Sequence, residues 1–318
     1  EASIVIFDET DSPVYKVNIS EIFPKEIASV ELSNDSSEIS KQTINFAFRS
    51  YTPINIAFGS DSNIPDGLNN ISGTIDESIR HAISKLSHIH LTSTLESKSR
   101  LVSLGEVPAN IHVTGAPGLE GIKEQASLSR SDLISKFSLI ANTPICLLLF
   151  HPVVQESSSA GIQIKIILEA LSRKSELQII GILPNSDAGS EPIRQEMNAS
   201  KNLKLQTYSN LSRNEFLSLM KEADFMIGNS SSGIIEAGSF GTPVINIGNR
   251  QKLRQRNINV VDVNLDSDEI YEKIEMVLNN GKHPAKNIYG DGNTGKRILN
   301  ILETTPLNKE LLNKVLTY

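Results

Sequence analysis

A turn rich in small polar residues follows a short apolar run, and its side chains are the first candidates for ligand binding. The run, residues 225–227, ends at Gly228 and leads into Asn229, Ser230, Ser231, Ser232 and Gly233. A pattern compatible with a helix follows, so hydroxyls and backbone N–H groups of the turn can face one point at the positive end of that helix. This predicts an anion site that suits a phosphate. The alternative is a serine cluster that caps the helix and holds no ligand.

Charged residues flank this turn on its C-terminal side. Glu236 lies one helical turn further on, where a carboxylate can accept hydrogen bonds from sugar hydroxyls. Arg250, with Arg254 and Arg256 behind it, follows the apolar run 244–247. A guanidinium fork suits phosphate and uracil–ribose contacts, although a solvated basic loop would also contain such arginines.

Two other apolar runs end in polar residues. His151 directly follows residues 145–150, and Asn185 comes shortly after residues 177–183. If these runs are parallel strands, their carboxyl ends meet at one edge of the sheet, together with the serine turn. We expect His151 to donate to phosphate or to act in acid–base chemistry; a histidine satisfied at a strand end is the alternative. The convergence of three polar strand ends is stronger evidence than any one motif.

A helical pattern over residues 74–88 contains two carboxylates in its first turn, Asp76 and Glu77. They either stabilise the helix dipole or serve in proton transfer, for which a carboxylate must reach the substrate and be tuned by burial. The chain has no paired His and Cys ligands and no P-loop lysine, so neither a metal nor a cofactor is predicted.

These residues must be positioned by elements that alternate almost one for one in the second half. The expected strands are residues 145–150, 177–183, 203–207, 225–227, 244–247 and 260–263. The expected helices are residues 160–171, 191–198, 213–222, 233–239, 267–278 and 295–302. Such alternation predicts an α/β fold with a parallel sheet covered on both faces. A short helix is expected in the tail, residues 308–317.

The first half is less regular. Residues 3–7, 14–17 and 54–58 are strand candidates, and from residue 89 onward we expect strands at 89–91 and 111–113 with a helix at 94–104 between them. The polar stretch 118–143 is the expected boundary between two domains. We therefore divide the chain into an N-terminal domain (1–125), a C-terminal domain (126–302) and a tail (303–318).

Composition limits the classes of partner. The 318 residues suffice for two domains, and a net charge of −7 argues against nucleic acid as the main partner. No apolar run has the length of a membrane span, so no membrane partner is expected. The one cysteine, Cys146, lies in an apolar run and allows no disulfide within the chain, which fits a reducing cytoplasm.

Several of these stretches together resemble the UDP-N-acetylglucosamine 2-epimerases. The closest likeness is to the hydrolysing branch that serves sialic and related nonulosonic acid synthesis. The matching stretches are GTIDESIRHAISKLSH (73–88), 151–153, GNSSSGIIE (228–236), 241–248, Arg250 with Gln251, and IYGDGN (288–293). They occur in the order of the family and extend from about residue 71 to residue 302.

The resemblance implies two Rossmann-like domains facing across a cleft, the glycosyltransferase-B architecture, with a shortened N-terminal domain. It implies that Ser230, Ser231, Gly233 and Glu236 bind the UDP of a UDP-sugar, with Arg250, His151 and Asn185 also lining the nucleotide site. Asp76 would be an acid–base carboxylate and His151 a second catalytic group. In the family UDP leaves by elimination across carbons 1 and 2, and water then adds, giving N-acetylmannosamine. A homodimer or homotetramer is the implied assembly.

The N-terminal motifs depart from the family pattern. The glycine-threonine-arginine turn after the first strand is missing, and Asn70 stands where the family has a catalytic glutamate. An amide cannot accept a proton as a carboxylate does. Three functions therefore stay open: the hydrolysing 2-epimerase, with N-acetylglucosamine or a related diacetamido sugar; a catalytically impaired UDP-sugar binding protein; and a glycosyltransferase of the same architecture.

Overall fold

The structure is a computed structural model that describes residues 2–7, 13–27, 44–54, 75–185, 189–200, 203–306, 308–315 and 317. The chain forms two compact units, Glu1–Leu86 and Ser87–Tyr318. The boundary between these compact units lies at residue 86, whereas the domain boundary expected from the sequence lies at residue 125; that domain division stays a prediction. Among the described residues, no helix combines the length and the apolar character that crossing a membrane requires.

The first unit contains an antiparallel sheet and one helix. Its strands are β1 (Ala2–Phe7), β2 (Pro13–Ile27) and β3 (Ile44–Ile54), paired in the order β1-β2-β3, and its helix is α1 (Ile75–Leu86). β2 is much longer than the expected strand 14–17. Polar residues interrupt its apolar pattern, so the sequence indicated only part of it. The pairing of β2 with β3 shifts register beside Pro24. β3 ends at Ile54, where a strand was expected to begin; residues 55–58 lie outside the described part.

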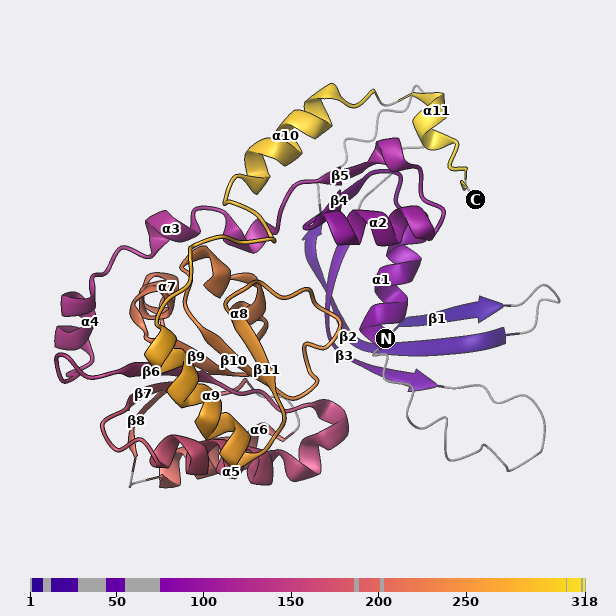
Figure 1. Cartoon of the computed structure of the whole chain (residues 1–318). Coiled ribbons are helices and arrows are strands. Elements are labelled where there is room, and N and C mark those ends of the chain that lie inside the picture. The colour runs from indigo at the N-terminus through magenta and orange to yellow at the C-terminus, as the bar shows by residue number, and fades with distance from the viewer. Residues whose placement is uncertain are drawn as a thin grey trace. The chain divides into compact units, whose positions relative to one another are not determined.

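The second unit is built around six parallel strands (Figure 1). They are β6 (Ile145–Leu149), β7 (Gln178–Ile182), β8 (Lys204–Tyr208), β9 (Phe225–Gly228), β10 (Val244–Ile247) and β11 (Val260–Val263). Their order is β11-β10-β9-β6-β7-β8. The chain thus runs outward from β6 to β8, returns to β9 beside β6, and continues to the other edge. This confirms the α/β fold with a parallel sheet and puts a topological switch point between β6 and β9.

Both faces of this sheet are covered, as its continuous apolar strands require. Cys146 and Leu148 of β6 pack on one face with helices α5 (Ala160–Ser172) and α9 (Ser267–Asn280). Leu147 and Leu149 pack on the other face with α4 (Arg130–Lys136) and α7 (Arg213–Glu222). All four are at most 6% exposed. Because burying one leucine side chain stabilises a fold by about 1.5–3 kcal/mol, β6 alone anchors both layers of helices.

Helices alternate with the strands of the second half, as the sequence pattern predicts, and one further helix, α4, precedes the first strand of the sheet. They are α4 (Arg130–Lys136), α5 (Ala160–Ser172), α6 (Ser190–Ala199), α7 (Arg213–Glu222), α8 (Ser231–Ile235) and α9 (Ser267–Asn280). The expected extent of α8, residues 233–239, is wrong. The helix begins two residues earlier, at Ser231, because Ser230 caps it, and after Glu236 the chain continues as a 3-10 helix at Ala237–Ser239.

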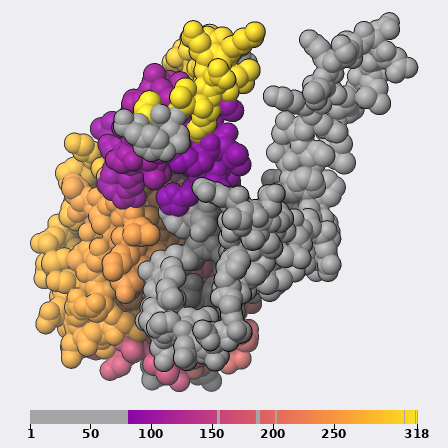
Figure 2. Space-filling model, turned by 90° about the vertical axis from the view of Figure 1, so that its right-hand side faces the viewer, coloured from indigo at the N-terminus to yellow at the C-terminus, as the bar shows by residue number. Residues whose placement is uncertain are grey.

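The remaining elements of this unit lie away from the six-stranded sheet. β4 (His90–Thr92) and β5 (Ile111–Val113) pair in parallel, with α2 (Leu95–Ser103) between them in the chain. Two connecting segments lie side by side, because Ala116 N–H donates to the Tyr289 carbonyl at 2.7 Å. The tail carries α10 (Thr294–Thr304) and α11 (Lys309–Leu312). It returns to α2, where Thr317 N–H donates to the Gly105 carbonyl; Figure 2 shows the yellow tail lying against these purple residues.

Candidate functional site at the strand switch point

The carboxyl ends of β6 and β9 approach each other closely at the switch point. Leu149 pairs with Gly228 in the strand register. Gly228 has φ +133°, and a Cβ atom on it would lie 1.9 Å from the Leu149 carbonyl oxygen. Only glycine fits this close approach and this left-handed backbone. The glycine that ends β9 therefore lets the serine turn begin directly beside the end of β6.

Asn229 joins the ends of these two strands. Its side-chain oxygen accepts from the backbone N–H of His151, and its amide nitrogen donates to the His151 carbonyl, both at 2.8 Å. The residue is 2% exposed, so this side chain is directed into the protein and not toward a ligand. These two side-chain hydrogen bonds fix the backbone of His151, two residues past the end of β6, beside the turn.

The end of β10 is attached to the same residue. The carbonyl of Asn229 accepts from Nη1 of Arg250 at 3.1 Å and from the side-chain amide of Gln251 at 2.9 Å. Gln251 is buried, whereas Arg250 is exposed. The structure thus brings the His151 backbone, the serine turn and the Arg250 guanidinium together around Asn229. The sequence predicted that the first two strand ends meet, and only the family resemblance placed Arg250 beside them; the ligand-binding roles of these residues stay predictions.

The serine turn offers hydroxyls and amides, but only a weak helix dipole. Ser230 caps α8, and its hydroxyl oxygen lies 2.9 Å from that of Ser232. Ser230, Ser231 and Ser232 are half-buried, and Gly233 is buried against Val244. α8 has only five residues, fewer than the helix expected at residues 233–239, so its dipole is small. Local N–H groups and hydroxyls, not a macrodipole, are the donors that this turn can supply to an anion.

Glu236 follows α8 and is held by an arginine. Its Oε1 lies 2.7 Å from Nη2 of Arg213, the first residue of α7. The carboxylate side chain is 12% exposed. Burial raises the pKa of the Glu236 carboxyl, and the Arg213 guanidinium opposes that rise. The site therefore contains a largely buried carboxylate whose charged form depends on one arginine.

The end of β7 reaches the same edge of the sheet by its backbone. Gly189, which precedes α6, has φ +88°, and a Cβ atom on it would lie 3.1 Å from Cβ of Pro152 and 3.0 Å from Ser157. Asn185 is exposed, and its carbonyl accepts from Nη2 of Arg194 at 3.0 Å. Residues 186–188 lie outside the described part. The role of the Asn185 side chain stays a prediction.

Asp76 belongs to the other compact unit. It lies in the first turn of α1, and side chains in that part of α1 are outside the described set. Its expected part in proton transfer therefore stays a prediction.

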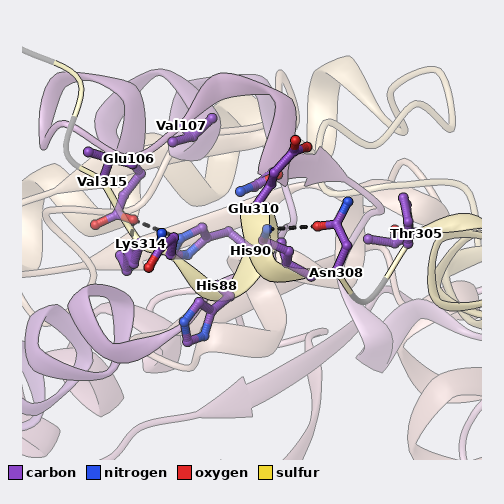
Figure 3. A pocket seen from close by; sticks show the side chains of 13 residues that line it. His88, His90, Glu106, Val107, Thr305, Asn308, Glu310, Lys314 and Val315 are labelled. Atoms are coloured by element: carbon purple, nitrogen blue, oxygen red, sulfur yellow. Dashed lines mark hydrogen bonds and ion pairs between the residues drawn. The ribbon is translucent and has the colours of Figure 1, made fainter.

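A second polar cluster lies under the tail, away from the switch point. Glu106 is 2% exposed, and its Oε2 lies 3.0 Å from Nε2 of His90 and 2.7 Å from Nζ of Lys314. Figure 3 shows this group beside a cavity of about 370 Å³ between β4 and the tail. The Lys314–Glu106 ion pair attaches the tail to the β4–β5 layer, where His90 of β4 contacts the same carboxylate. Sequence reasoning missed this cluster because its members are separated by up to 224 residues and follow no motif.

A family model described as UDP-N-acetylglucosamine 2-epimerase matches residues 67–303. The chain belongs to this family. The match covers the whole six-stranded sheet, α1 and the serine turn. It therefore includes all the candidate residues at the switch point and Asp76.

Relatives within this 2-epimerase family are longer than this chain. The UDP-N,N'-diacetylbacillosamine 2-epimerase (hydrolyzing) of Legionella pneumophila is 42% identical over 248 residues, which cover 78% of this chain and 66% of the relative. The UDP-N-acetylglucosamine 2-epimerase of Neisseria meningitidis serogroup B is 34% identical over 224 residues, covering 70% and 59%. The chain thus spans less than two thirds of the length of these relatives.

Solved structures of 2-epimerases share the fold. The crystal structure of UDP-GlcNAc 2-epimerase from Neisseria meningitidis bound to UDP-GlcNAc matches with a TM-score of 0.59 at 20% identity, over 72% of this chain and 65% of that one. The crystal structure of a putative UDP-N-acetylglucosamine 2-epimerase from Listeria monocytogenes matches with a TM-score of 0.60 at 15% identity. The match covers 80% of this chain and 66% of that one.

Sequence reasoning recognised the serines but not two residues that hold the site together. Asn229 was counted among the residues facing a ligand, whereas its side chain binds the His151 backbone. Arg213 had been noticed only as the start of a helix. The position of Asn229 directly after the glycine that ends a strand was a sequence signal for its structural role. No sequence signal pairs Arg213 with Glu236.

Proposed function

We propose that this chain is a hydrolysing UDP-sugar 2-epimerase, which releases UDP from UDP-N-acetylglucosamine and forms N-acetylmannosamine. The observation that carries this proposal is the junction around Asn229. It holds His151, the serine turn and Arg250 at one point of the sheet edge where α/β proteins bind ligands. Membership of the 2-epimerase family supports the same reading.

In this proposal the junction binds the diphosphate of UDP. The hydroxyls of Ser230 and Ser231, the N–H groups of the turn and Gly233, and the Arg250 guanidinium supply donors, and Glu236 accepts from the ribose. When the bond between carbon 1 and the diphosphate breaks, negative charge grows on UDP. Donors that are already held in place stabilise this charge without having to reorganise.

The reaction then proceeds by elimination and hydration. The proton on carbon 2 and the UDP group leave together, so that a double bond forms between carbons 1 and 2. Water adds its hydroxyl to carbon 1 and a proton returns to carbon 2 from the opposite face. Asp76 is the residue we assign to proton transfer, with His151 near the leaving diphosphate.

A related diacetamido sugar is the alternative substrate. It is supported by the higher identity to the Legionella diacetylbacillosamine enzyme, 42%, than to the Neisseria N-acetylglucosamine enzyme, 34%. In this proposal the residues at the junction bind the nucleotide, so they do not discriminate at carbon 4 of the sugar, where these two substrates differ.

A binding protein without turnover is the second candidate. It is favoured by Asn70, which stands where the resemblance places a catalytic glutamate. Such a protein would keep the UDP junction of the second unit but would lack one of the groups that move the proton of carbon 2.

Incubation with each UDP-sugar in deuterated water tests these possibilities. Mass spectrometry of an active enzyme's products would find free UDP and a 2-epimer that carries deuterium at carbon 2. If calorimetry shows that UDP binds but no product forms, the second candidate, a binding protein without turnover, is supported. If the chain neither binds UDP nor forms product, the proposal fails.

A further inference from the structure

The Arg213 guanidinium is fixed between two different segments beside the serine turn. Its Nη2 lies 2.7 Å from Oε1 of Glu236 and donates to the Gly118 carbonyl at 2.9 Å. Gly118 lies in the segment that leads from β5 toward the six-stranded sheet. The next residue in this segment, Leu119, is fully buried. Arg213 is therefore held at two points although its own side chain is 43% exposed.

The helices at Arg213 and Glu236 also pack against each other. Leu217 of α7 and Ile234 of α8 pack in one apolar cluster with Leu119, and both are fully buried. α7 begins with a capping box formed by Ser212 and Glu215, so its first residue has a defined position. Figure 1 shows α7 and α8 beside each other on one side of the sheet.

The ion pair leaves acceptor capacity on the carboxylate. A carboxylate has two oxygens and about four lone-pair sites, and Arg213 occupies one of them. Two vicinal hydroxyls, such as those of ribose, can use the others. A neutral, protonated Glu236 would have fewer acceptor sites and would carry a hydroxyl of its own.

We propose that Arg213 is a positioning residue that presents Glu236 as a charged acceptor to the ribose 2′- and 3′-hydroxyls of UDP, and that it thereby makes the site prefer ribonucleotides to deoxyribonucleotides. This inference rests on the proposed function, because it needs UDP bound at the junction. A site built to hydrogen-bond a hydroxyl discriminates against a ligand that lacks it, since the buried acceptor is then left unpaired.

Binding of UDP and 2′-deoxy-UDP to purified variants, measured by calorimetry, tests the inference. The unaltered protein is expected to bind UDP about tenfold more tightly than 2′-deoxy-UDP, as one charge-assisted hydrogen bond implies. Arg213→Gln is expected to reduce this ratio to less than about threefold, mainly through weaker UDP binding. Glu236→Gln should do the same, and the double variant should lose no more than either single one.

Two further variants separate positioning from a general effect on stability. Arg213→Lys keeps a positive charge and should restore part of the ratio. Arg173 is also paired with an aspartate, through its Nη1 2.6 Å from Oδ1 of Asp268, so Arg173→Gln is the matched control and should leave the ratio unchanged. Thermal unfolding identifies any variant that has lost its fold.

The outcomes distinguish this inference from the proposed function. If the unaltered protein does not bind UDP, the proposed function itself fails. If it binds UDP but binds 2′-deoxy-UDP equally well, or if folded Arg213→Gln keeps the original ratio, then the role of Arg213 is wrong while the UDP site stands.

Discussion

At the scale of single residues, the site depends on an asparagine that need not touch a ligand. The side chain of Asn229 pairs with both backbone groups of His151, and its carbonyl receives Arg250 and Gln251. Residues that bind a phosphate must be held in place before it arrives, otherwise part of the binding energy is lost in ordering them. Asn229 is buried at the point where this ordering is needed.

Replacing Asn229 by aspartate should therefore weaken UDP binding. The substitution keeps the shape, but it removes the donor to the His151 carbonyl and adds a negative charge there. Loss of a buried hydrogen bond costs about 1–3 kcal/mol, so we expect UDP affinity to fall roughly tenfold or more in calorimetry. Asn300→Asp, at an exposed position of α10, is the control that should change little.

A double-mutant cycle with His151→Ala shows how Asn229 acts. If it works by holding His151, then Asn229→Asp should reduce UDP affinity much less in the His151→Ala background. An equal reduction in both backgrounds would mean that the asparagine does not act by way of the imidazole.

Glu236 gives the site a pH dependence whose sign follows from its burial. Since burial raises the pKa of this carboxyl, it binds its proton in the folded state at a higher pH than in the unfolded chain. Its contribution to stability therefore falls as pH rises from the ordinary glutamate value through the raised pKa. UDP binding should change in the opposite sense, because the charged form is the better acceptor.

We accordingly expect UDP affinity to fall as the pH is lowered through the raised pKa of Glu236. Titration calorimetry across this range, with Glu236→Gln as the comparison, measures the effect. The variant should bind UDP more weakly at neutral pH but with a flatter dependence on pH in the acid range. A variant with the original pH profile would refute the assignment.

At the scale of elements, local signals decide how much of the structure can be predicted. The bounds of α7 are those expected from sequence, because its apolar period coincides with a Ser212–Glu215 capping box. Lys136 and Ser212 hold the pKa of the Glu215 carboxyl at about 2, which reflects the same local contacts. For α8, the cap at Ser230 determined the start, whereas the sequence pattern favoured Gly233.

The same distinction between local sequence signals and three-dimensional packing applies to the candidate site. The strand ends could be predicted because buried parallel strands are continuous apolar runs that stop at polar residues. The contact between Arg213 and Glu236 could not, since it depends on how α7 packs against α8 in three dimensions. The tail contact of Lys314 with Glu106 was likewise beyond prediction, because it joins residues at opposite ends of the second unit.

The tail provides a prediction at this scale. Glu106→Gln removes the charge that binds both His90 and Lys314 at a position with 2% exposure. Removing one partner from a buried ion pair costs about 3 kcal/mol, so we expect lower thermal stability and faster hydrogen exchange in residues 308–317. Glu310→Gln changes an exposed glutamate beside the same cavity and should have little effect. Unaltered exchange in the tail of Glu106→Gln would contradict this role.

At the scale of the whole molecule, the order of the strands decides where a ligand can bind. The chain leaves β6 in one direction and returns to β9 beside it, so the helices that follow these two strands diverge and open the sheet edge between them. The cavity under the tail lies elsewhere, next to β4 and α11, and the Glu106 carboxylate in its wall already contacts His90 and Lys314. The topology therefore favours the switch point over the tail as the nucleotide site.

Hydrogen exchange measured with and without UDP distinguishes these two places directly. Bound UDP should slow exchange in residues 149–153, 228–236 and 248–251, because these segments meet around Asn229 and supply its hydrogen-bond partners. The ends of β8 and β11, at the outer edges of the sheet, should be unaffected. Uridine, which lacks the diphosphate, should protect residues 228–232 much less than UDP does. Protection confined to residues 305–315 and the segment around Glu106 would place the nucleotide under the tail and would overturn the assignment of the switch point.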